Sequence, residues 1–310
     1  MFCRAKKQTK IPVIINCDTG IDDAVALMIA IKSEKLDIKL ITTDVGNVKT
    51  TQAAKNCLNI LELVGAGQIP VCAGEGKCLA KERPRPHVHG SGGLGEYTFE
   101  ENSRRITEGD AVEKIYEVLM NSQQKITIIS LSPPTNIAKL IQNHKDCLDK
   151  IERIVFMAGT IEEVEKNEMP YAEFNVSCDP EAGDVLIKSK LPLEIVPMEM
   201  GHTAYLDWQE VFKTKNENFV GSVFEIIFRS YKDRHVKNGI ATHDGCAIAY
   251  VTNPELFKTK PVCAKVKYYD SINTGILTMD FSKKPNAITC VSMNIPAFKK
   301  LYFKCLKKCK

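Results

Sequence analysis

Short runs of β-branched and aliphatic residues alternate with segments of helical periodicity through the first two thirds of the chain. Short apolar runs are typical of strands, and apolar residues at helical spacing are typical of helices. The predicted strands span residues 12–16, 38–43, 69–72, 126–131, 154–158 and 193–197. The predicted helices span residues 21–32 (an amphipathic helix), 50–64, 110–120 and 136–143, with Thr135 as the N-cap of the last, and another helix begins near residue 180.

The last third of the chain is first helical and then β-rich. Helices are predicted at 218–237 and 243–251, strands within 261–281, and a final helix near Ala297. Strands that alternate with helices predict an α/β fold with a mostly parallel central sheet flanked by helices. Because no internal repeat or low-complexity linker interrupts the chain, we expect residues 1–310 to form a single large domain, with a small β-rich insertion near 261–281.

Composition narrows the class of protein. Hydrophobic residues make up 44% and charged residues 26% of 310, as in ordinary globular proteins. The net charge is +4, and the basic run at 298–310, with six lysines, predicts a solvated terminal helix and no nucleic-acid partner. The sequence contains no apolar stretch of about 18 residues, so no membrane span is predicted. Residues 1–10 lack the apolar core of a signal peptide, so we expect a poorly ordered start and a cytoplasmic protein.

The twelve cysteines are scattered along the chain, and none forms a Cys-x-x-Cys pair. That spacing argues against a zinc or redox site. We therefore expect small buried thiols, with disulfides as the weaker alternative.

The strongest local signal is the aspartate loop, Asp18-Thr19-Gly20-Ile21-Asp22-Asp23, which follows a predicted strand and opens a helix. One or two aspartates would need no explanation beyond helix capping. Three within six residues repel one another unless a cation or hydrogen bonds compensate, which favours a metal or polyol site. All-oxygen ligands indicate Ca²⁺ or Mg²⁺ rather than zinc. An aspartate-nucleophile phosphatase is the alternative, but its nucleophile would fall on Asn16, and an amide cannot form the phospho-enzyme.

Three further segments carry polar residues that are uninformative singly. They are Ala172-Glu173-Phe174-Asn175, preceded by Asn167; Thr242-His243-Asp244 at a helix start; and the glycine-rich segment 87–95, which contains His89. The last has no strand-turn-helix context and so is not a phosphate loop. We interpret it as a flap that closes over a ligand.

Together these segments resemble the nucleoside hydrolase family of the inosine–uridine preferring, nonspecific type. The resemblance extends from Pro12 to beyond Tyr250 and includes the pieces 42–47, 135–138, 157–159 and 179–182. It implies an open Rossmann-like sheet and hydrolysis of the N-glycosidic bond of ribonucleosides to ribose and free base. It also implies a homodimer or homotetramer that acts in purine and pyrimidine salvage.

The resemblance also implies a role for each matching residue. Calcium would be bound by Asp18, Asp23, Asp244 and the main-chain carbonyl of Leu131. The ribose 2′- and 3′-hydroxyls would be held by Asp22, Asn47 and Asn175, and the 5′-hydroxyl by Asn167 and Glu173. Asp18 would take a proton from the calcium-bound water, and His243 would protonate the departing base. Contacts to the base or the flap would come from His89 and Tyr231.

Two residues depart from the family pattern. The family begins its loop with aspartate where this chain has Asn16, and usually has proline where this chain has Thr19. Asn16 removes one charge from behind the expected ligands, and such partners tune ligands. A low-activity or non-catalytic nucleoside-binding relative is therefore the second hypothesis, and a phosphatase of another α/β family the third.

Overall fold

The computed structural model describes residues 9–82, 89–95, 97–100, 103–161, 172–214, 219–232, 239–269 and 274–309. Its main sheet has nine strands, namely β1 Ile11–Cys17, β2 Leu36–Thr43, β3 Val71–Ala73, β4 Ile126–Ser130, β5 Ile151–Met157, β6 Leu193–Val196, β9 Phe257–Tyr269, β10 Thr274–Asp280 and β11 Ala287–Met293. A separate short ribbon pairs β7 Leu206–Asp207 with β8 Gly239–Ile240.

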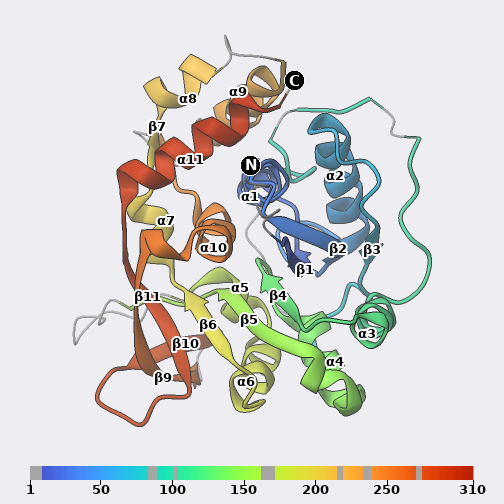
Figure 1. The fold of residues 1–310 in the computed structure, drawn as a ribbon, viewed down its shortest axis with the longest axis vertical. Coiled ribbons are helices and arrows are strands. Elements are labelled where there is room, and N and C mark those ends of the chain that lie inside the picture. Colours follow the sequence, from blue (N-terminus) through green and yellow to red (C-terminus); the bar gives the residue numbers. More distant parts are fainter. Residues whose placement is uncertain are drawn as a thin grey trace, which may run out of the picture.

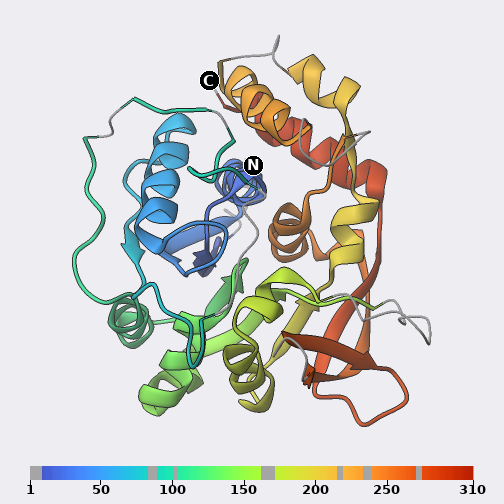
Figure 2. The same cartoon turned by 180° about the vertical axis from the view of Figure 1, so that it is seen from behind.

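The helices alternate with the strands along the first two thirds of the chain (Figures 1 and 2). They are α1 Ile21–Lys32, α2 Thr50–Leu63, α3 Ala111–Asn121, α4 Thr135–Asn143, α5 Phe174–Cys178, α6 Pro180–Lys188, α7 Met198–Thr203, α8 Trp208–Thr214, α9 Phe219–Lys232, α10 His243–Thr252 and α11 Ile295–Lys307. Two short 3₁₀ turns, Lys145–Lys150 and Pro254–Leu256, precede β5 and β9.

The order of the strands fixes where a ligand can bind. The sheet runs β10-β9-β11-β6-β5-β4-β1-β2-β3, and the strands from β11 to β3 are parallel. The chain builds outward from β1 through β2 to β3, then returns and builds the other way through β4, β5 and β6. The topological switch point therefore lies between β1 and β4, where ligands of open α/β sheets bind. The predicted mostly parallel α/β fold is confirmed.

The β-rich segment joins the central sheet. Strand β11 pairs parallel with β6, and β9 pairs antiparallel with both β11 and β10. The segment predicted as an insertion near 261–281 thus supplies an antiparallel edge to an otherwise parallel sheet. The sequence pattern located β9 and β10, whereas β11 lies beyond the predicted range 261–281 and was missed. The pattern carried no information about the partners of these strands.

The two faces of the sheet pack against different helices. In β1 the side chains of Val13, Ile15 and Cys17 enter one buried cluster, and Ile14 enters the other. This alternation is the period-2 geometry of a strand that is buried on both faces. The first cluster includes residues of α1, α2, α10 and α11, and the second includes residues of α3, α4 and α6.

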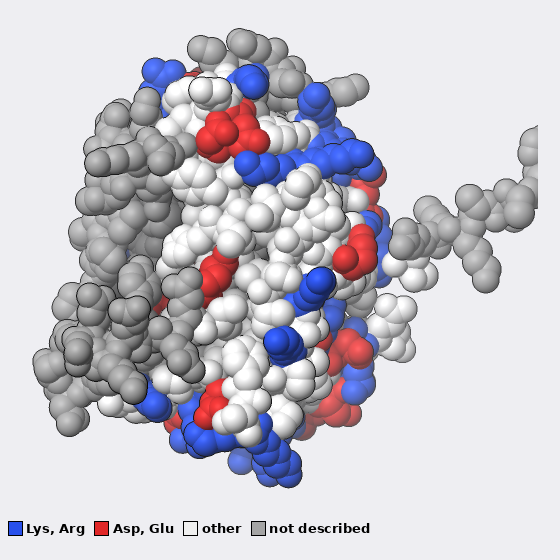
Figure 3. Space-filling view, turned by 90° about the vertical axis from the view of Figure 1, so that its left-hand side faces the viewer, with Lys and Arg blue, Asp and Glu red and all other residues white. Residues whose placement is uncertain are grey.

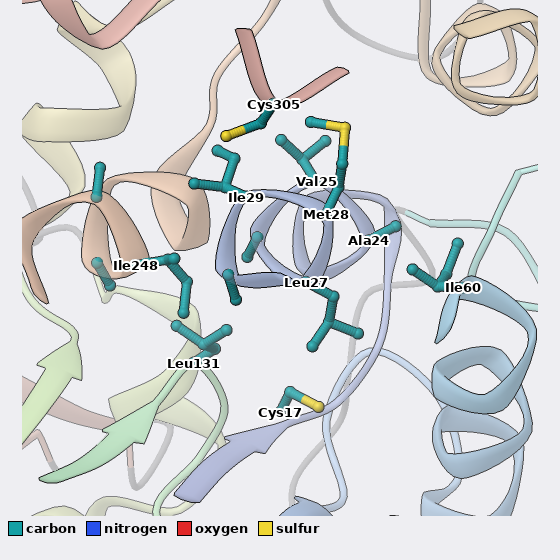
Figure 4. Packing of buried hydrophobic residues seen from close by; sticks show 14 of the residues in the cluster. Cys17, Ala24, Val25, Leu27, Met28, Ile29, Ile60, Leu131, Ile248 and Cys305 are labelled. Atoms are coloured by element: carbon teal, nitrogen blue, oxygen red, sulfur yellow. The ribbon is translucent and has the colours of Figure 1, made fainter. Parts of the chain in front are cut away.

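Helix α1 is buried on nearly every side. Figure 4 shows Val25, Met28 and Ile29 on the side of Cys305 in α11, and Leu27 on the side of Cys17 in β1. The residues Ala24 to Ala30 are all buried. The prediction of an amphipathic helix is therefore wrong. Apolar residues do recur at helical spacing, but the middle of the helix is apolar all round, as expected of a central helix.

Other predicted details need smaller corrections. Thr135 is the first residue of α4, and the N-cap is Pro134; the Thr135 hydroxyl donates to Asp179 Oδ2 at 2.6 Å. Residues 218 and 233–237 of the predicted helix 218–237 lie outside the described residues. Six elements of seven residues or fewer (α5, α7, α8, β7, β8 and β11) and the two 3₁₀ turns were not predicted. The eleven described cysteines are buried free thiols, as predicted.

The terminal helix has two faces. In α11, Phe298, Tyr302 and Leu306 are buried against the core, whereas lysines occupy other positions. Lys299 Nζ bonds Glu210 at 2.6 Å, so this helix is packed and ion-paired rather than solvated all round.

On the face shown in Figure 3, acidic and basic side chains are interspersed among uncharged ones. Across the described residues, no helix is long and apolar enough to cross a membrane.

Truncation of α1 tests the central place of this helix. We expect Leu27→Ala to lower the free energy of unfolding by about 2–5 kcal/mol, because Leu27 is fully buried and the cavity cannot close completely. Urea unfolding measures this loss, and Lys32→Ala at the end of the same helix is the control, with an expected change within about 0.5 kcal/mol. Equal losses in the two variants would contradict the central packing of α1.

Candidate active site

The aspartate loop leaves the carboxyl end of β1 at the switch point. Asp18 follows β1 directly, and Asp22 and Asp23 lie in the first turn of α1. Space there is tight, because a Cβ atom on Gly46 would lie 1.7 Å from Asp18 Oδ2. A glycine at 46 therefore lets the loop after β2 approach the Asp18 carboxylate.

Asp18 and Asp23 are buried and bound by main-chain donors. Asp18 Oδ2 accepts from the Asn47 main-chain N at 2.7 Å, and Asp18 Oδ1 accepts from Asn47 Nδ2 at 3.1 Å. Asp23 Oδ2 accepts from Gly20 N at 2.8 Å and its Oδ1 from Asp18 N at 3.3 Å. Asn47 thus connects the two acidic side chains to the loop after β2.

Asp22 faces the start of α10. Its Oδ2 accepts from the Asp244 main-chain N at 3.1 Å. Its Oδ1 is buried and accepts no hydrogen bond from the described residues. An acceptor oxygen that is buried without a partner is costly, so this atom is suited to a ligand donor or a cation.

Helix α5 contributes the opposite wall, next to the ends of β4 and β5. Asn175 Nδ2 donates to the carbonyls of Leu131 and Met157, each at 3.0 Å, which orients the amide. Glu173 caps α5 and accepts from the main-chain N of Asn175 at 2.7 Å and of Gly159 at 3.1 Å. Both side chains are therefore held in place by main-chain groups.

Two partly buried histidines complete the ring of polar groups. His89 Nδ1 lies 3.0 Å from Ile21 N and must accept from it, so the hydrogen of neutral His89 resides on Nε2. His243 Nδ1 lies 3.1 Å from the Met198 carbonyl, which can only accept, so Nδ1 carries the hydrogen there. Burial lowers the pKa of His89 to about 4 and the pKa of His243 to about 3. Both rings are neutral at neutral pH.

These groups surround a cavity of about 310 Å³. Volumes of roughly 300–1,000 Å³ are typical of small-molecule sites. The predicted site residues that line it are Asp22, Asn47, His89, Leu131, Glu173, Asn175, His243 and Asp244. Asp18 and Asp23 lie beside this lining, in contact with Asn47. Asn167 lies outside the described residues, as does the side chain of Tyr231.

Part of the lining was not predicted. Several of these residues are apolar or small, namely Ile21, Met157, Ala172, Phe174, Ser177, Met198, Ile240 and Ala241. An apolar residue beside a cavity looks the same in a sequence as one in the core. Ile21, Ala172 and Phe174 fall within segments singled out for their polar neighbours, and that placement is a signal that could have found them.

The site concentrates carboxyl groups in a dry environment. Burial raises the pKa of Asp22 to about 8, that of Asp23 to about 6 and that of Glu173 to about 7. Burial, followed by the charge of a neighbouring aspartate, raises the pKa values of Asp18 and Asp244 well above their usual range. Such an array favours any ligand that brings positive charge or hydrogen-bond donors.

The donor chemistry fits a hard divalent cation. The candidate ligands are all oxygen atoms, the carboxylates are buried close together, and Asp22 Oδ1 is unpaired. Within the described ranges, however, no three side chains of His, Cys, Asp or Glu already converge on one point at metal-ligand distances. The carboxylates are instead bound to main-chain and amide donors, and a cation would compete with these.

Comparison with known proteins places the chain in a family. The family model described as inosine-uridine preferring nucleoside hydrolase matches residues 13–300. A pyrimidine-specific ribonucleoside hydrolase RihA from Salmonella paratyphi B is 32% identical over 299 residues, covering 93% of this chain and 96% of that protein. A non-specific ribonucleoside hydrolase RihC from Escherichia fergusonii is 30% identical over 304 residues, covering 96% and 99%.

The fold agrees with a solved structure. A purine-preferring ribonucleoside hydrolase from Gardnerella vaginalis superimposes with a TM-score of 0.86 at 23% identity, covering 96% of this chain and 98% of that one. The predicted assignment to a family of N-glycosyl hydrolases is thus confirmed. The chain belongs to the inosine–uridine preferring nucleoside hydrolase family.

Proposed function

We propose that this chain hydrolyses the N-glycosidic bond of ribonucleosides with the residues that surround the cavity at the switch point. The observation that carries the proposal is the arrangement of Asp22, Asn47, Glu173 and Asn175 around one cavity that also contains His243. Carboxylate and amide groups suit the hydroxyls of a ribose, and a histidine suits a departing base.

The sugar would be held by groups whose orientation is already fixed. Asp22 Oδ1 is an unpaired buried acceptor, suited to a ribose hydroxyl. Asn175 uses its Nδ2 on two carbonyls, so its Oδ1 is the atom that remains for the substrate. Together with Asn47 these residues would take the 2′- and 3′-hydroxyls, and Glu173, with Asn167, the 5′-hydroxyl. Fixed groups of this kind favour a sugar that develops positive charge as the bond to the base breaks.

A calcium ion would be held by Asp18, Asp23, Asp244 and the Leu131 carbonyl, and when bound it would lower the pKa of a coordinated water. Asp18 would then accept the proton of the attacking water. Asn47 donates to both carboxylate oxygens of Asp18 and thereby orients this general base. Calcium dependence is supported by the all-oxygen donor set and by the close burial of these acidic groups.

His243 would protonate the base as it leaves. Because Nδ1 donates to the Met198 carbonyl, the proton would be delivered from Nε2. The neutral ring must first gain that proton, which burial disfavours and negative charge on the departing base favours.

A phosphatase has no support in the geometry. Asn16 is fully buried and bonded to Asp44 and Ser132, and it does not line the cavity. Neither asparagine nor aspartate at this position would meet a phosphoryl group there. Cytoplasmic residence, a role in salvage and assembly as a homodimer or homotetramer stay predictions.

Release of free ribose tests the proposed activity. We expect ribose from at least one of inosine, uridine, guanosine and cytidine when Ca²⁺ is present, and none after chelation. Asp18→Asn should lower kcat by about 10²–10⁴-fold, because an amide cannot accept the proton of the attacking water as the general base does. The control is Asp37→Asn at the surface, where Asp37 pairs with Lys39. No ribose from any of the four nucleosides with Ca²⁺ present would refute the proposal.

A change of leaving group tests His243. We expect His243→Ala to lower kcat for inosine by about 10²–10⁴-fold, because the base leaves without a proton donor. The same variant should hydrolyse a nitrophenyl riboside almost as fast as the unaltered enzyme, because that leaving group departs as a stable anion. His144→Ala, which removes a histidine paired with Glu113, is the control. Equal losses on both substrates would exclude His243 as the acid.

The stability of the metal-free protein tests the burial of Glu173. Burial raises its pKa from 4.5 to about 7, so between these values the folded state holds a proton that the unfolded state has released. The free energy of unfolding should therefore fall as pH rises from 5 to 7, by on the order of 1 kcal/mol per pH unit for this group. Urea unfolding at several pH values should show that the free energy of unfolding of Glu173→Gln falls less steeply with pH. Glu152→Gln, at an exposed position, should keep the pH dependence of the unaltered protein. The same pH dependence of the free energy of unfolding in the unaltered protein and in Glu173→Gln would contradict a raised pKa of Glu173.

A further inference from the structure

A second buried polar layer lies directly behind the aspartate loop. Asn16 is the penultimate residue of β1, and Asp44 follows β2; both are buried. Asn16 Nδ2 donates to Asp44 Oδ2 at 2.8 Å. Neither residue is among those that line the cavity. The mechanism above uses neither side chain.

The hydrogen bonds of Asn16 specify an amide at this position. Its Nδ2 donates to Asp44 and to Ser132 Oγ at 2.9 Å. Its Oδ1 accepts from Thr42 Oγ1 at 2.8 Å and from Asn136 Nδ2 at 3.1 Å. These four bonds use the full capacity of an asparagine side chain. An aspartate could accept from Thr42 and Asn136, but its other oxygen would face the Asp44 carboxylate.

Asp44 is the better of the two positions for a charge. Asp44 Oδ2 also accepts from the main-chain N of Asn136 at 3.0 Å, in the first turn of α4. Main-chain donors at the start of a helix favour an anion. Burial raises the pKa of Asp44 to about 7, whereas the hydrogen bonds from Asn136 N and the Asn16 amide act to lower that pKa, so the carboxylate is charged at pH 8.

The charge of Asp44 reaches the proposed base. Asp44 N donates to the Cys17 carbonyl at 2.9 Å, which connects it to the residue before Asp18. The negative charge of Asp44 is one of the influences that raise the pKa of Asp18. Asp44 therefore acts on the loop through hydrogen bonds and through its field, without touching the cavity.

We propose that Asp44 is a positioning residue that supplies the buried negative charge behind the aspartate loop, and that this charge requires an amide at position 16. The absence of an aspartate at 16 is then not a lost charge, because the carboxylate resides one strand away on Asp44. Its effect on catalysis rests on the proposed hydrolase function, whereas the pairing itself does not.

The pairing predicts that the effect of Asp44→Asn on the melting temperature changes sign with the residue at position 16. We expect Asn16→Asp to lower the melting temperature by roughly 5–10 °C at pH 8, because two buried carboxylates then face each other. Asp44→Asn alone should also destabilise, because an amide meets an amide. Added to Asn16→Asp, however, Asp44→Asn should raise the melting temperature, since it relieves the repulsion. The double variant should stay below the unaltered protein, because a single atom of the new amide at position 44 cannot both donate to the new carboxylate at position 16 and accept from the Asn136 N–H.

Melting curves of the unaltered protein, the two single variants and the double variant measure this reversal. Asp110→Asn is the matched control: Asp110 caps α3 away from the pair, so its effect should be the same with asparagine or aspartate at 16. A loss from Asp44→Asn in both backgrounds would overturn the pairing. So would an Asn16→Asp variant as stable as the unaltered protein.

Ribose release from the same proteins tests the catalytic part. Each single variant should lose about 10- to 100-fold in kcat, the range for residues behind metal ligands, with KM changed less than about 3-fold. The double variant should exceed Asn16→Asp in kcat. A rise in KM with unchanged kcat would overturn the positioning role. If the unaltered protein releases no ribose, the hydrolase proposal fails, and the melting curves still decide the pairing.

Discussion

Five acidic side chains lie around one crevice, and water is excluded from most of them. Asp18, Asp23, Glu173 and Asp244 are buried, and Asp22 is partly buried. Each is disfavoured as an anion by burial, and several also by their neighbours. The fold offsets this cost with main-chain N–H groups of Gly20, Asn47, Asn175 and Asp244, which donate to four of these side chains. The crevice can therefore hold acidic groups in fixed positions before any ligand arrives, and preorganised groups are what stabilise a developing cation.

These donors are available because of where the crevice lies. At the switch point between β1 and β4, loops leave the carboxyl ends of parallel strands and helices begin, so unpaired main-chain N–H groups are concentrated there. Close approach is also needed. Gly20 and Gly46 have no side chain where His89, Asn47 and the Asp18 carboxylate pack against them. The site thus depends on the order of the strands and on two glycines as much as on the acidic residues themselves.

The sequence predicted what local patterns and chemistry-bearing residues encode. Strongly apolar strands such as β1 and β4 were located to within a residue, and eight of the predicted site residues line one cavity. The pairing of β9, β10 and β11 with the central sheet could not be predicted, because strand partners depend on contacts distant in sequence. Helix α5 has five residues, too few for a periodic signal, yet it positions Glu173 and Asn175. Met157, Met198 and Ile240 resemble core residues, and it is the cavity that distinguishes them.

The two departures from the family pattern have local partners that the sequence alone did not connect to them. Thr19, where proline is usual, places its hydroxyl 2.7 Å from Cys57 Sγ and 3.4 Å from Cys17 Sγ. Asn16 donates to Asp44. Cys57 lies in α2 and Asp44 follows β2, so these two partners come from the elements next to α1 and β1. A missing aspartate at 16 considered alone suggests reduced activity. Considered with its hydrogen bonds, the same amide is what allows a carboxylate at 44, whose field still reaches Asp18. A substitution in a buried polar layer therefore has to be judged together with every atom it bonds, since one layer accommodates a given charge at more than one position.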